Sequence, residues 1–364
     1  MQSTKVLMLT SELPPQPGGI GNHAHHLAKT LNENNFELTV LADTRSTDGV
    51  EEADFDAKQS YAIHRIKRTN PMVFTYFERL IMANRLLQSH ELLLVSGKFP
   101  IWIGGILRLW HSKKVFAVIH GTEVATPSII KQKFTRWCLR RFEAVIAVSN
   151  YTKSLVSDWG ISNIEVVPNG FVIANNESVT VSRAVPPRLI TVGNVTKRKG
   201  QKNVIRALPK LLELYPDLQY DVVGIPTEKD SLERYAKSLG VAHAVVFHGK
   251  VSDHQKVTLL KQASIFMMLS EPTKSGSVEG FGIAILEANA LGVPAIGAKG
   301  CGIEDAIETG YSGELVRYDN IEAIVEAVDR ILKQYARFSE GAESWSKKFT
   351  WNQIIKQYIA ILNR

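Results

Sequence analysis

The chain has 364 residues, of which 45% are hydrophobic, and this length and composition predict two globular domains rather than a single core. No run of about twenty apolar residues is present, so we expect no membrane span, and an apolar strand begins almost at once, so we expect no signal peptide. The formal net charge of +7 favours an anionic partner such as a nucleotide or an anionic lipid. No motif supports nucleic-acid binding.

The two cysteines, Cys138 and Cys301, are too few for a disulfide framework. We expect both thiols to be buried and reduced, which indicates a cytoplasmic protein.

The first half of the chain alternates apolar strands with helices. We predict strands at 5–10, 36–42, 62–66, 91–95, 115–120, 144–149 and 164–167, and helices at 22–34, 73–88, 100–110, 128–141 and 150–159. This alternation predicts a doubly wound parallel sheet with helices on both faces. Ligands of such sheets bind at the carboxyl ends of the strands, where His120 ends one predicted strand.

The Gly-rich turn after the first strand, Gly18-Gly19-Ile20-Gly21, is typical of a phosphate-binding loop. Its spacing is not Gly-x-Gly-x-x-Gly, so a nicotinamide cofactor with Asp43 as the ribose-binding acid is not favoured.

Two groups of residues suggest a metal site at first sight. His23, His25 and His26 open a helix, but no second cluster completes a metal site. Asp54-Phe55-Asp56 lies in the polar stretch 46–60, which we expect to be a solvated loop. We therefore predict no metal site.

The pattern restarts after a polar stretch, Asn175–Pro187, which we expect to be the interdomain linker. Lys197, Arg198 and Lys199 follow a strand at 188–193 and precede a helix that reaches residue 215. Three cations at a strand-to-helix loop can clamp a diphosphate. We predict further strands ending at 224 and 248 and at 312–316, and helices at 321–335 and 349–362.

The stretch from Ser270 to Gly300 gives the most specific indication of a binding site. A strand at 264–269 enters a Gly-rich loop that ends in Glu279-Gly280-Phe281-Gly282, and a helix follows. Free backbone N–H groups at a helix start attract phosphate, and Gly280 and Gly282 let a ligand approach the backbone. Glu279 and Glu287 would then accept hydrogen bonds from sugar and ribose hydroxyls on either side of the phosphates. This combination predicts a nucleotide-sugar site.

The string Glu-Gly-Phe-Gly-x4-Glu, followed by Gly-x-Pro, resembles the retaining glycosyltransferases of the family-4 kind, the glycosyl transferases group 1. The resemblance implies the α/β GT-B fold, in which two doubly wound Rossmann-like domains have parallel sheets facing a cleft and a C-terminal helix crosses back to the first domain. It implies an acceptor-binding domain at 1–175 with helix 349–364, and a nucleotide-sugar-binding domain at 186–345.

The resemblance also implies roles for individual residues. His120, Glu279 and Lys199 would be catalytic, with His120 near the reacting carbon of the sugar. The backbone at Val251 would pair with the base. Asn194 stands where the family has an arginine, a charge that Arg198 or Lys197 could replace. The implied donor-binding set is Gly19, Arg198, Lys199, Val251, Glu279, Gly280, Phe281, Gly282 and Glu287.

The function implied is a metal-independent hexosyltransferase that needs no cofactor. It would move a sugar, with retention, from a nucleotide-diphosphate sugar to a hydroxyl of a lipid-linked, polysaccharide or other glycoconjugate acceptor. A UDP-sugar is the first expectation, with a GDP- or ADP-sugar as alternatives. The alternatives to this function are an inactive partner subunit of the same fold, or a sugar-nucleotide epimerase or phosphorylase.

Basic residues are concentrated between Lys131 and Arg141, with Phe134 and Trp137 interleaved. A basic amphipathic surface can hold anionic lipid, which predicts peripheral attachment to the inner face of a membrane. The alternative is a solvated basic face beside a buried helix at 101–110.

Overall fold

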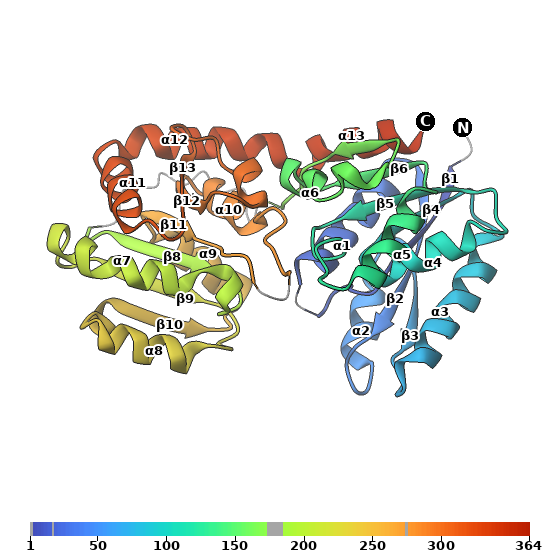
Figure 1. Ribbon diagram of the computed structural model, residues 1–364, viewed down its shortest axis with the longest axis horizontal. Helices are drawn as coiled ribbons and strands as arrows, with labels where there is room; N and C mark the ends of the chain where they lie inside the picture. Colours follow the sequence, from blue (N-terminus) through green and yellow to red (C-terminus); the bar gives the residue numbers. More distant parts are fainter. Residues whose placement is uncertain (1–2, 17, 173–184, 274–275) are drawn as a thin grey trace. The chain divides into compact units, whose positions relative to one another are not determined.

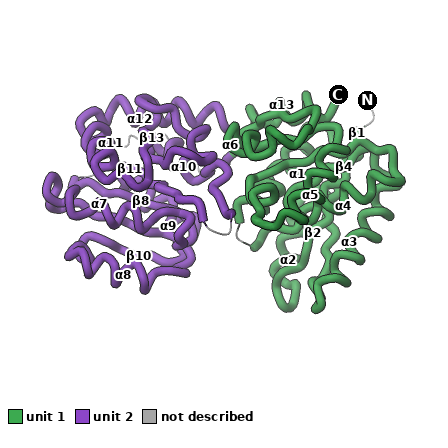
Figure 2. The backbone as a smooth tube through the Cα atoms, viewed as in Figure 1, with its two compact units in different colours: residues 1–170, 351–364 green, residues 171–350 purple. Residues whose placement is uncertain are grey.

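The computed structural model describes residues 3–16, 18–172, 185–273 and 276–364, and the chain forms two compact units (Figure 2). Unit 1 comprises residues 1–170 and 351–364, and unit 2 comprises residues 171–350. The stretch 175–187, expected as the linker, lies mostly outside the described residues.

Unit 1 is built on a seven-stranded parallel sheet with the order β3-β2-β1-β4-β5-β6-β7 (Figure 1). Its central strands are nearly continuous apolar runs, because helices cover both faces of the sheet. The strands are β1 (Thr4–Thr10), β2 (Phe36–Thr44), β3 (Ala62–Lys67), β4 (Leu92–Ser96), β5 (Lys114–Ile119), β6 (Ala144–Ala147) and β7 (Ile164–Val166).

The helices of unit 1 are α1 (Gly19–Glu33), α2 (Val50–Asp56), α3 (Met72–Leu87), α4 (Lys98–Leu107), α5 (Ile129–Leu139), α6 (Asn150–Ser154), the 3-10 turn η1 (Ser157–Trp159) and α13 (Trp351–Leu362). Helix α4 packs against both α3 and α5, and buries Ile101 and Leu107 against the sheet. The last helix, α13, packs on α1, where Tyr358 Oη lies 3.1 Å from His23 Nε2.

Unit 2 is built on a six-stranded parallel sheet with the order β10-β9-β8-β11-β12-β13. The strands are β8 (Arg188–Val192), β9 (Gln219–Val223), β10 (Val245–Gly249), β11 (Ile265–Met268), β12 (Ala295–Ala298) and β13 (Gly313–Val316). The helices are α7 (Gln201–Leu214), α8 (Lys229–Ser238), α9 (Asp253–Lys261), α10 (Ile283–Asn289), α11 (Ile321–Lys333) and α12 (Tyr335–Ser346). The 3-10 turns are η2 (Lys197–Lys199), η3 (Ala242–Ala244), η4 (Gly302–Ala306) and η5 (Lys347–Phe349).

Both sheets reverse their strand order once, between β1 and β4 in unit 1 and between β8 and β11 in unit 2. Ligands of doubly wound sheets bind beyond the carboxyl ends of the strands at such a switch point. A ligand is therefore expected to bind at the loops that follow these four strands.

Two sequence expectations are corrected by the structure. The stretch 46–60 is not a solvated loop, because it contains α2, whose Glu52 is buried and accepts hydrogen bonds from the backbone N–H groups of Arg45 (2.9 Å) and Ser46 (2.8 Å). Hydrophobic periodicity does not reveal a helix fixed by a buried carboxylate. The helix expected at 321–335 ends at Lys333, and a separate helix, α12, follows.

The expectation that both cysteines are buried is confirmed. Cys138 and Cys301 are buried free thiols. Within the described ranges, no helix has the length and apolar character needed to cross a bilayer.

Candidate active site

Two loops meet at the switch point of unit 2. Gly200, at the end of the loop after β8, has a positive φ of 75°, and a Cβ there would lie 1.8 Å from the carbonyl oxygen of Leu269. The backbone N–H of Glu271 donates to the carbonyl of Arg198 at 3.2 Å. Only a glycine lets the loop after β8 lie this close to the loop after β11.

This contact brings together the cations and the carboxylate singled out in the sequence. Lys199 Nζ lies 2.9 Å from Glu279 Oε2, and Arg198 Nη1 donates to the same oxygen. Lys197 points elsewhere and pairs with Glu271 at 3.5 Å. Of the two cations considered as replacements for the arginine that Asn194 lacks, Arg198 is therefore the one that reaches Glu279.

The charge of Glu279 is set by these neighbours. Its side chain is 11% exposed, and burial alone would raise its pKa, but the positive charges of Lys199 and Arg198 lower the pKa below its ordinary value. Glu279 is thus a carboxylate at neutral pH, and the three side chains together carry one net positive charge. Such a group can bind an anion of higher charge by exchanging partners.

The Gly-rich loop after Glu279 is held against the turn that follows β12. The N–H of Gly302 donates to the carbonyl of Glu279 at 2.9 Å, and a Cβ on Gly302 would lie 1.9 Å from the Gly280 carbonyl oxygen. Phe281 is buried against Phe349, with ring centroids 5.9 Å apart. Its side chain therefore belongs to the core, and only its backbone could contact a ligand.

Glu287 lies on α10 and faces α9. Both of its carboxylate oxygens are 3.3 Å from Lys256 Nζ, which also lies 3.5 Å from Asp253. Burial would lower the pKa of Lys256, but Glu287 and Asp253 raise it. Helix α9 begins two residues after Val251, so the predicted base and ribose contacts lie on neighbouring elements.

His120 follows β5 in unit 1 and is buried. Its Nε2 lies 3.0 Å from Ser96 Oγ at the end of β4, and its ring meets that of His23 edge-on at 5.0 Å. Burial lowers the pKa of His120 to about 4, so the imidazole is neutral at physiological pH. A neutral imidazole can exchange a hydrogen bond with a sugar hydroxyl but supplies no positive charge.

Glu123 is a functional candidate that the sequence reasoning passed over. It is buried, and its Oε2 accepts the backbone N–H of His120 at 3.0 Å, while its Oε1 has no partner among the described residues. Burial raises the pKa of Glu123 to about 7. The only sequence signal was its position three residues after a strand-end histidine, which does not distinguish a buried acid from a solvated one.

Two glycines at the start of α1, Gly19 and Gly21, have different roles. A Cβ on Gly21 would lie 3.2 Å from the backbone of Glu12, so this glycine serves close packing, whereas a Cβ on Gly19 would meet nothing within 4 Å. Gly19 thus leaves open space at the start of α1, beside the carboxyl end of the sheet.

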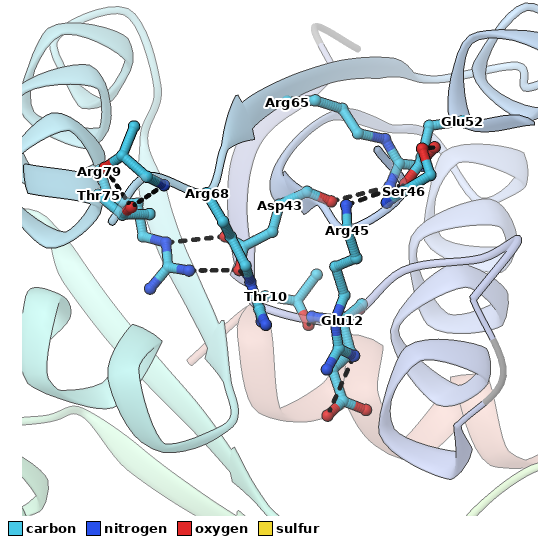
Figure 3. Close-up of polar contacts among 11 residues, drawn as sticks. Thr10, Glu12, Asp43, Arg45, Ser46, Glu52, Arg65, Arg68, Thr75 and Arg79 are labelled. Carbon is cyan, nitrogen blue, oxygen red and sulfur yellow. Dashed lines mark hydrogen bonds and ion pairs between the residues drawn. The ribbon is translucent and has the colours of Figure 1, made fainter. Parts of the chain in front are cut away.

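Asp43 is fully engaged, as Figure 3 shows. Its carboxylate accepts hydrogen bonds from Arg68 Nε and Arg79 Nε, both at 2.8 Å, and also contacts Arg79 Nη2. An acid held by two arginines is not available for a ribose, which removes the remaining argument for a nicotinamide site. Among the described residues, no group of three His, Cys, Asp or Glu side chains could hold a metal ion.

Comparison with known proteins gives the family. The model of the Glycosyltransferase Family 4 matches residues 17–175, and that of the Glycosyl transferases group 1 matches residues 173–348. The chain is a family 4 glycosyltransferase. It therefore belongs to the group that the Glu279-to-Glu287 string resembles, and it is a transferase enzyme.

The transferase is similar to curated relatives along nearly its whole length. It is 29% identical over 348 residues to the GDP-mannose-dependent alpha-(1-6)-phosphatidylinositol monomannoside mannosyltransferase of Mycolicibacterium smegmatis, covering 90% of this chain and 89% of the relative. It is 24% identical over 380 residues to the glycogen synthase of Mycobacterium tuberculosis, covering 95% and 90%.

Solved structures confirm the fold of the transferase as GT-B. Anabaena HepE in complex with UDP and glucose superposes with a TM-score of 0.78 at 19% identity, over 99% of both chains. The sucrose-phosphate synthase of Thermosynechococcus elongatus superposes with a TM-score of 0.82 at 16% identity, over 99% of this chain and 98% of the synthase.

The predicted site residues of the transferase fall into three groups within the described residues. Glu279, Lys199 and Arg198 are in direct contact; Glu287 is paired with Lys256 near Val251; His120 and Gly19 lie on the sheet edge of unit 1. His248, for which the sequence suggested no partner, is half-buried and lies 2.7 Å from the buried carboxylate of Asp221.

Proposed function

We propose that this transferase moves a sugar, with retention of configuration, from a nucleotide-diphosphate sugar to a hydroxyl of a glycolipid or polysaccharide acceptor. The observation that carries the proposal is the contact of Glu279 with both Lys199 and Arg198 at the switch point of unit 2. Two cations against one carboxylate suit a diphosphate, and the carboxylate suits the hydroxyls of the attached sugar.

The chemistry would rest on positioning and on stabilisation of the leaving group. Negative charge grows on the diphosphate as the sugar–phosphate bond breaks, and Lys199 and Arg198 offset that charge without a metal ion. Glu279 would orient the sugar. Neutral His120 remains our candidate for a hydrogen bond near the reacting carbon, and the leaving phosphate would take the proton of the acceptor hydroxyl.

On the nucleotide side, Glu287 would bind the ribose hydroxyls and the backbone at Val251 would bind the base. Gly280 and Gly282 would present backbone N–H groups to the diphosphate, as would the loop at Gly19. Phe281 would take part only through its backbone, since its ring is buried.

The donor to test first is GDP-mannose, because relatives that match almost the whole chain are GDP-mannose-dependent enzymes by name. A UDP-sugar is the alternative, since UDP is bound in one of the similar structures. We would titrate UDP-, GDP- and ADP-sugars into the protein by calorimetry, with and without EDTA. We expect the sugars of one nucleotide to bind equally in both conditions. Failure of every donor to bind, or binding that EDTA abolishes, would contradict the proposal.

We further propose that the acceptor lies in or on an anionic membrane that contacts the helical layer of α3, α4 and α5. Residues 98–142 contain nine Lys and Arg and one acid, Glu123, whereas the rest of the chain contains 34 Lys and Arg and 35 Asp and Glu. Glu123 is buried. The net positive charge of the protein is therefore concentrated in the segment that contains α4 and α5.

The same layer exposes apolar side chains. Along α3, one helical stripe of large hydrophobic residues is exposed to solvent: Val73, Phe74, Phe77 and Ile81. The half-buried rings of Tyr76, Phe99 and Trp102 continue across to α4, with Tyr76 and Phe99 stacked at 4.6 Å. Cationic, aromatic and apolar side chains on one surface are typical of proteins that bind membrane interfaces.

The membrane proposal is tested by flotation with vesicles of phosphatidylcholine alone and of phosphatidylcholine mixed with phosphatidylglycerol. We expect the protein to float with the anionic vesicles only, and less of it to float as salt screens the charges. Equal behaviour with both vesicles would contradict it.

A further inference from the structure

Lys98 occupies a distinctive position in unit 1. It opens α4 two residues after Ser96, the last residue of β4, which borders the switch point of the sheet. Ser96 Oγ in turn lies 3.0 Å from His120 Nε2. Lys98 therefore lies close in sequence to Ser96, the residue that contacts the candidate catalytic histidine, His120.

The ammonium group of Lys98 has weak partners. Nζ donates to Thr126 Oγ1 at 3.4 Å and lies 5.7 Å from the centroid of the Trp102 ring. Within the described parts of the chain, no carboxylate oxygen lies within ion-pair distance of it. The partly buried Lys199 and Lys256 differ, because each has a carboxylate within 3.3 Å.

A second cation lies at the start of α5, close to the residue that Lys98 contacts. Thr126, which accepts the hydrogen bond of Lys98, lies two residues before Ser128, whose hydroxyl accepts the backbone N–H of Lys131. Lys131 lies in the first turn of α5, at the far end of the loop that begins at His120, and it too lacks a carboxylate partner among the described residues. Burial lowers the pKa of Lys98, and the charge of Lys131 lowers it further, whereas Glu123 raises it. The two lysines therefore repel each other without a bridging anion, and Glu123 does not replace one because it is engaged with the backbone of His120.

Exposed apolar side chains precede Lys131 in the chain. Ile129 and Ile130 are 68% and 81% exposed, immediately before Lys131. A ligand that joins a phosphate to an apolar portion would satisfy both features at once.

We propose that Lys98 and Lys131 form a binding site for the phosphate of the acceptor, with Ile129 and Ile130 contacting the apolar portion next to it. This inference rests on the proposed function. It specifies the acceptor as a hydroxyl-bearing phosphate ester that is either a lipid headgroup or its water-soluble counterpart. The phosphate would relieve the repulsion between the lysines, and the hydroxyl would be held on the side of His120.

The experiment measures binding of inositol 1-phosphate and of unphosphorylated myo-inositol to the full chain by calorimetry. Lys98→Ala and Lys131→Ala should each weaken inositol 1-phosphate binding by about tenfold or more, as loss of a charged hydrogen bond does. Lys153→Ala, at an exposed lysine of α6 in the same unit, is the control and should leave it unchanged. Lys98→Arg should retain binding, which separates loss of charge from misfolding.

Two outcomes would overturn the site. One is equal binding of inositol 1-phosphate by the wild type and both alanine variants, and the other is equally tight binding of myo-inositol by the wild type. If phosphatidylinositol in phosphatidylcholine vesicles binds more tightly than inositol 1-phosphate, and the lysines are required, the source is a lipid. If the vesicles bind no more tightly, the source is a soluble phosphate ester, and the shared chemistry still holds.

Failure of the proposed function would look different. Donor titrations on the same variants should give wild-type affinities, because neither lysine is among the residues proposed to bind the donor, and the cations at Glu279 belong to unit 2. Suppose that the wild type binds inositol 1-phosphate through the two lysines but binds no nucleotide sugar. That result would support the phosphate site and contradict the proposed sugar transfer.

Discussion

The carboxyl edges of the two sheets share one strand order but differ in how they treat charge. In unit 2 the site groups are ionised and paired: Glu279 with Lys199 and Arg198, and Glu287 with Lys256. In unit 1 the groups around β5 are buried without counter-charges, so that the pKa values of His120 and His23 fall and the pKa of Glu123 rises. At neutral pH the edge of unit 2 presents ion pairs, whereas the imidazoles of His120 and His23 at the edge of unit 1 are uncharged.

This difference teaches that the doubly wound topology fixes where a ligand binds, whereas the loops fix what kind of ligand it is. An edge with preformed ion pairs can exchange its partners for a diphosphate at little desolvation cost. The neutral imidazoles at the edge of unit 1 suit uncharged hydroxyls. The predictions below test this contrast.

The largest effect is expected from removing a cation of unit 2. Lys199→Ala should lower kcat by about 10²–10³-fold, because one donor to the developing charge of the leaving group is lost. Lys197→Ala is the matched control, since Lys197 belongs to the same turn but pairs with Glu271. Initial-rate kinetics with saturating donor would measure both, and equal losses in the two variants would contradict a specific role for Lys199.

The next effect concerns the stability of unit 1. Because the pKa of Glu123 is about 7 when folded and 4.5 ordinarily, the free-energy cost of burying it is absent below pH 4.5, grows between pH 4.5 and 7, and is complete above pH 7. Glu123→Gln should therefore match the wild type at pH 4.5 and exceed its unfolding free energy by about 3 kcal/mol at pH 8. Denaturant titrations across this range would measure the difference.

The histidines require a control in that experiment. The lowered pKa of His120 makes stability rise between about pH 4 and 6.5, which opposes the contribution of Glu123 in the wild type. The difference in unfolding free energy between the variant and the wild type does not contain the His120 contribution, because both proteins have this histidine. Glu143→Gln, at an exposed carboxyl group of the same unit, should show no such pH-dependent difference. A pH-independent difference for Glu123→Gln would show that the carboxyl group is ionised and solvated.

A smaller effect is expected at the ribose side of unit 2. Glu287→Gln should weaken nucleotide-diphosphate binding by about 1–3 kcal/mol, because charged hydrogen bonds to hydroxyls are lost. Calorimetric titration of the nucleotide measures it. Unchanged affinity would refute the ribose role and leave Glu287 as the structural partner of Lys256.

The smallest effect is expected from the exposed charges of α5, away from the sheet edge. Lys133→Ala should weaken binding to phosphatidylglycerol-containing vesicles by about 1 kcal/mol, the contribution of one cation near an anionic surface. Lys237→Ala, an exposed lysine of unit 2, should have no effect. A similar loss in both variants would indicate nonspecific attraction by net charge.

The sequence by itself determined the alternating α/β architecture and the family. Strand and helix periods are local properties, and the string from Glu279 to Glu287 is contiguous, so both can be read without a fold. The same locality explains the failures: α2 depends on the buried carboxylate of Glu52, which no periodicity marks.

Only the tertiary structure decided how the site groups are charged. Arg198 and Lys199 meet Glu279 across 81 and 80 residues of sequence, and His23 meets Tyr358 across 335. Burial and partner charges set each pKa, and both come from segments that the chain brings together only on folding. For that reason the raised pKa of Glu123 and the role of Lys98 could be inferred only from the folded protein.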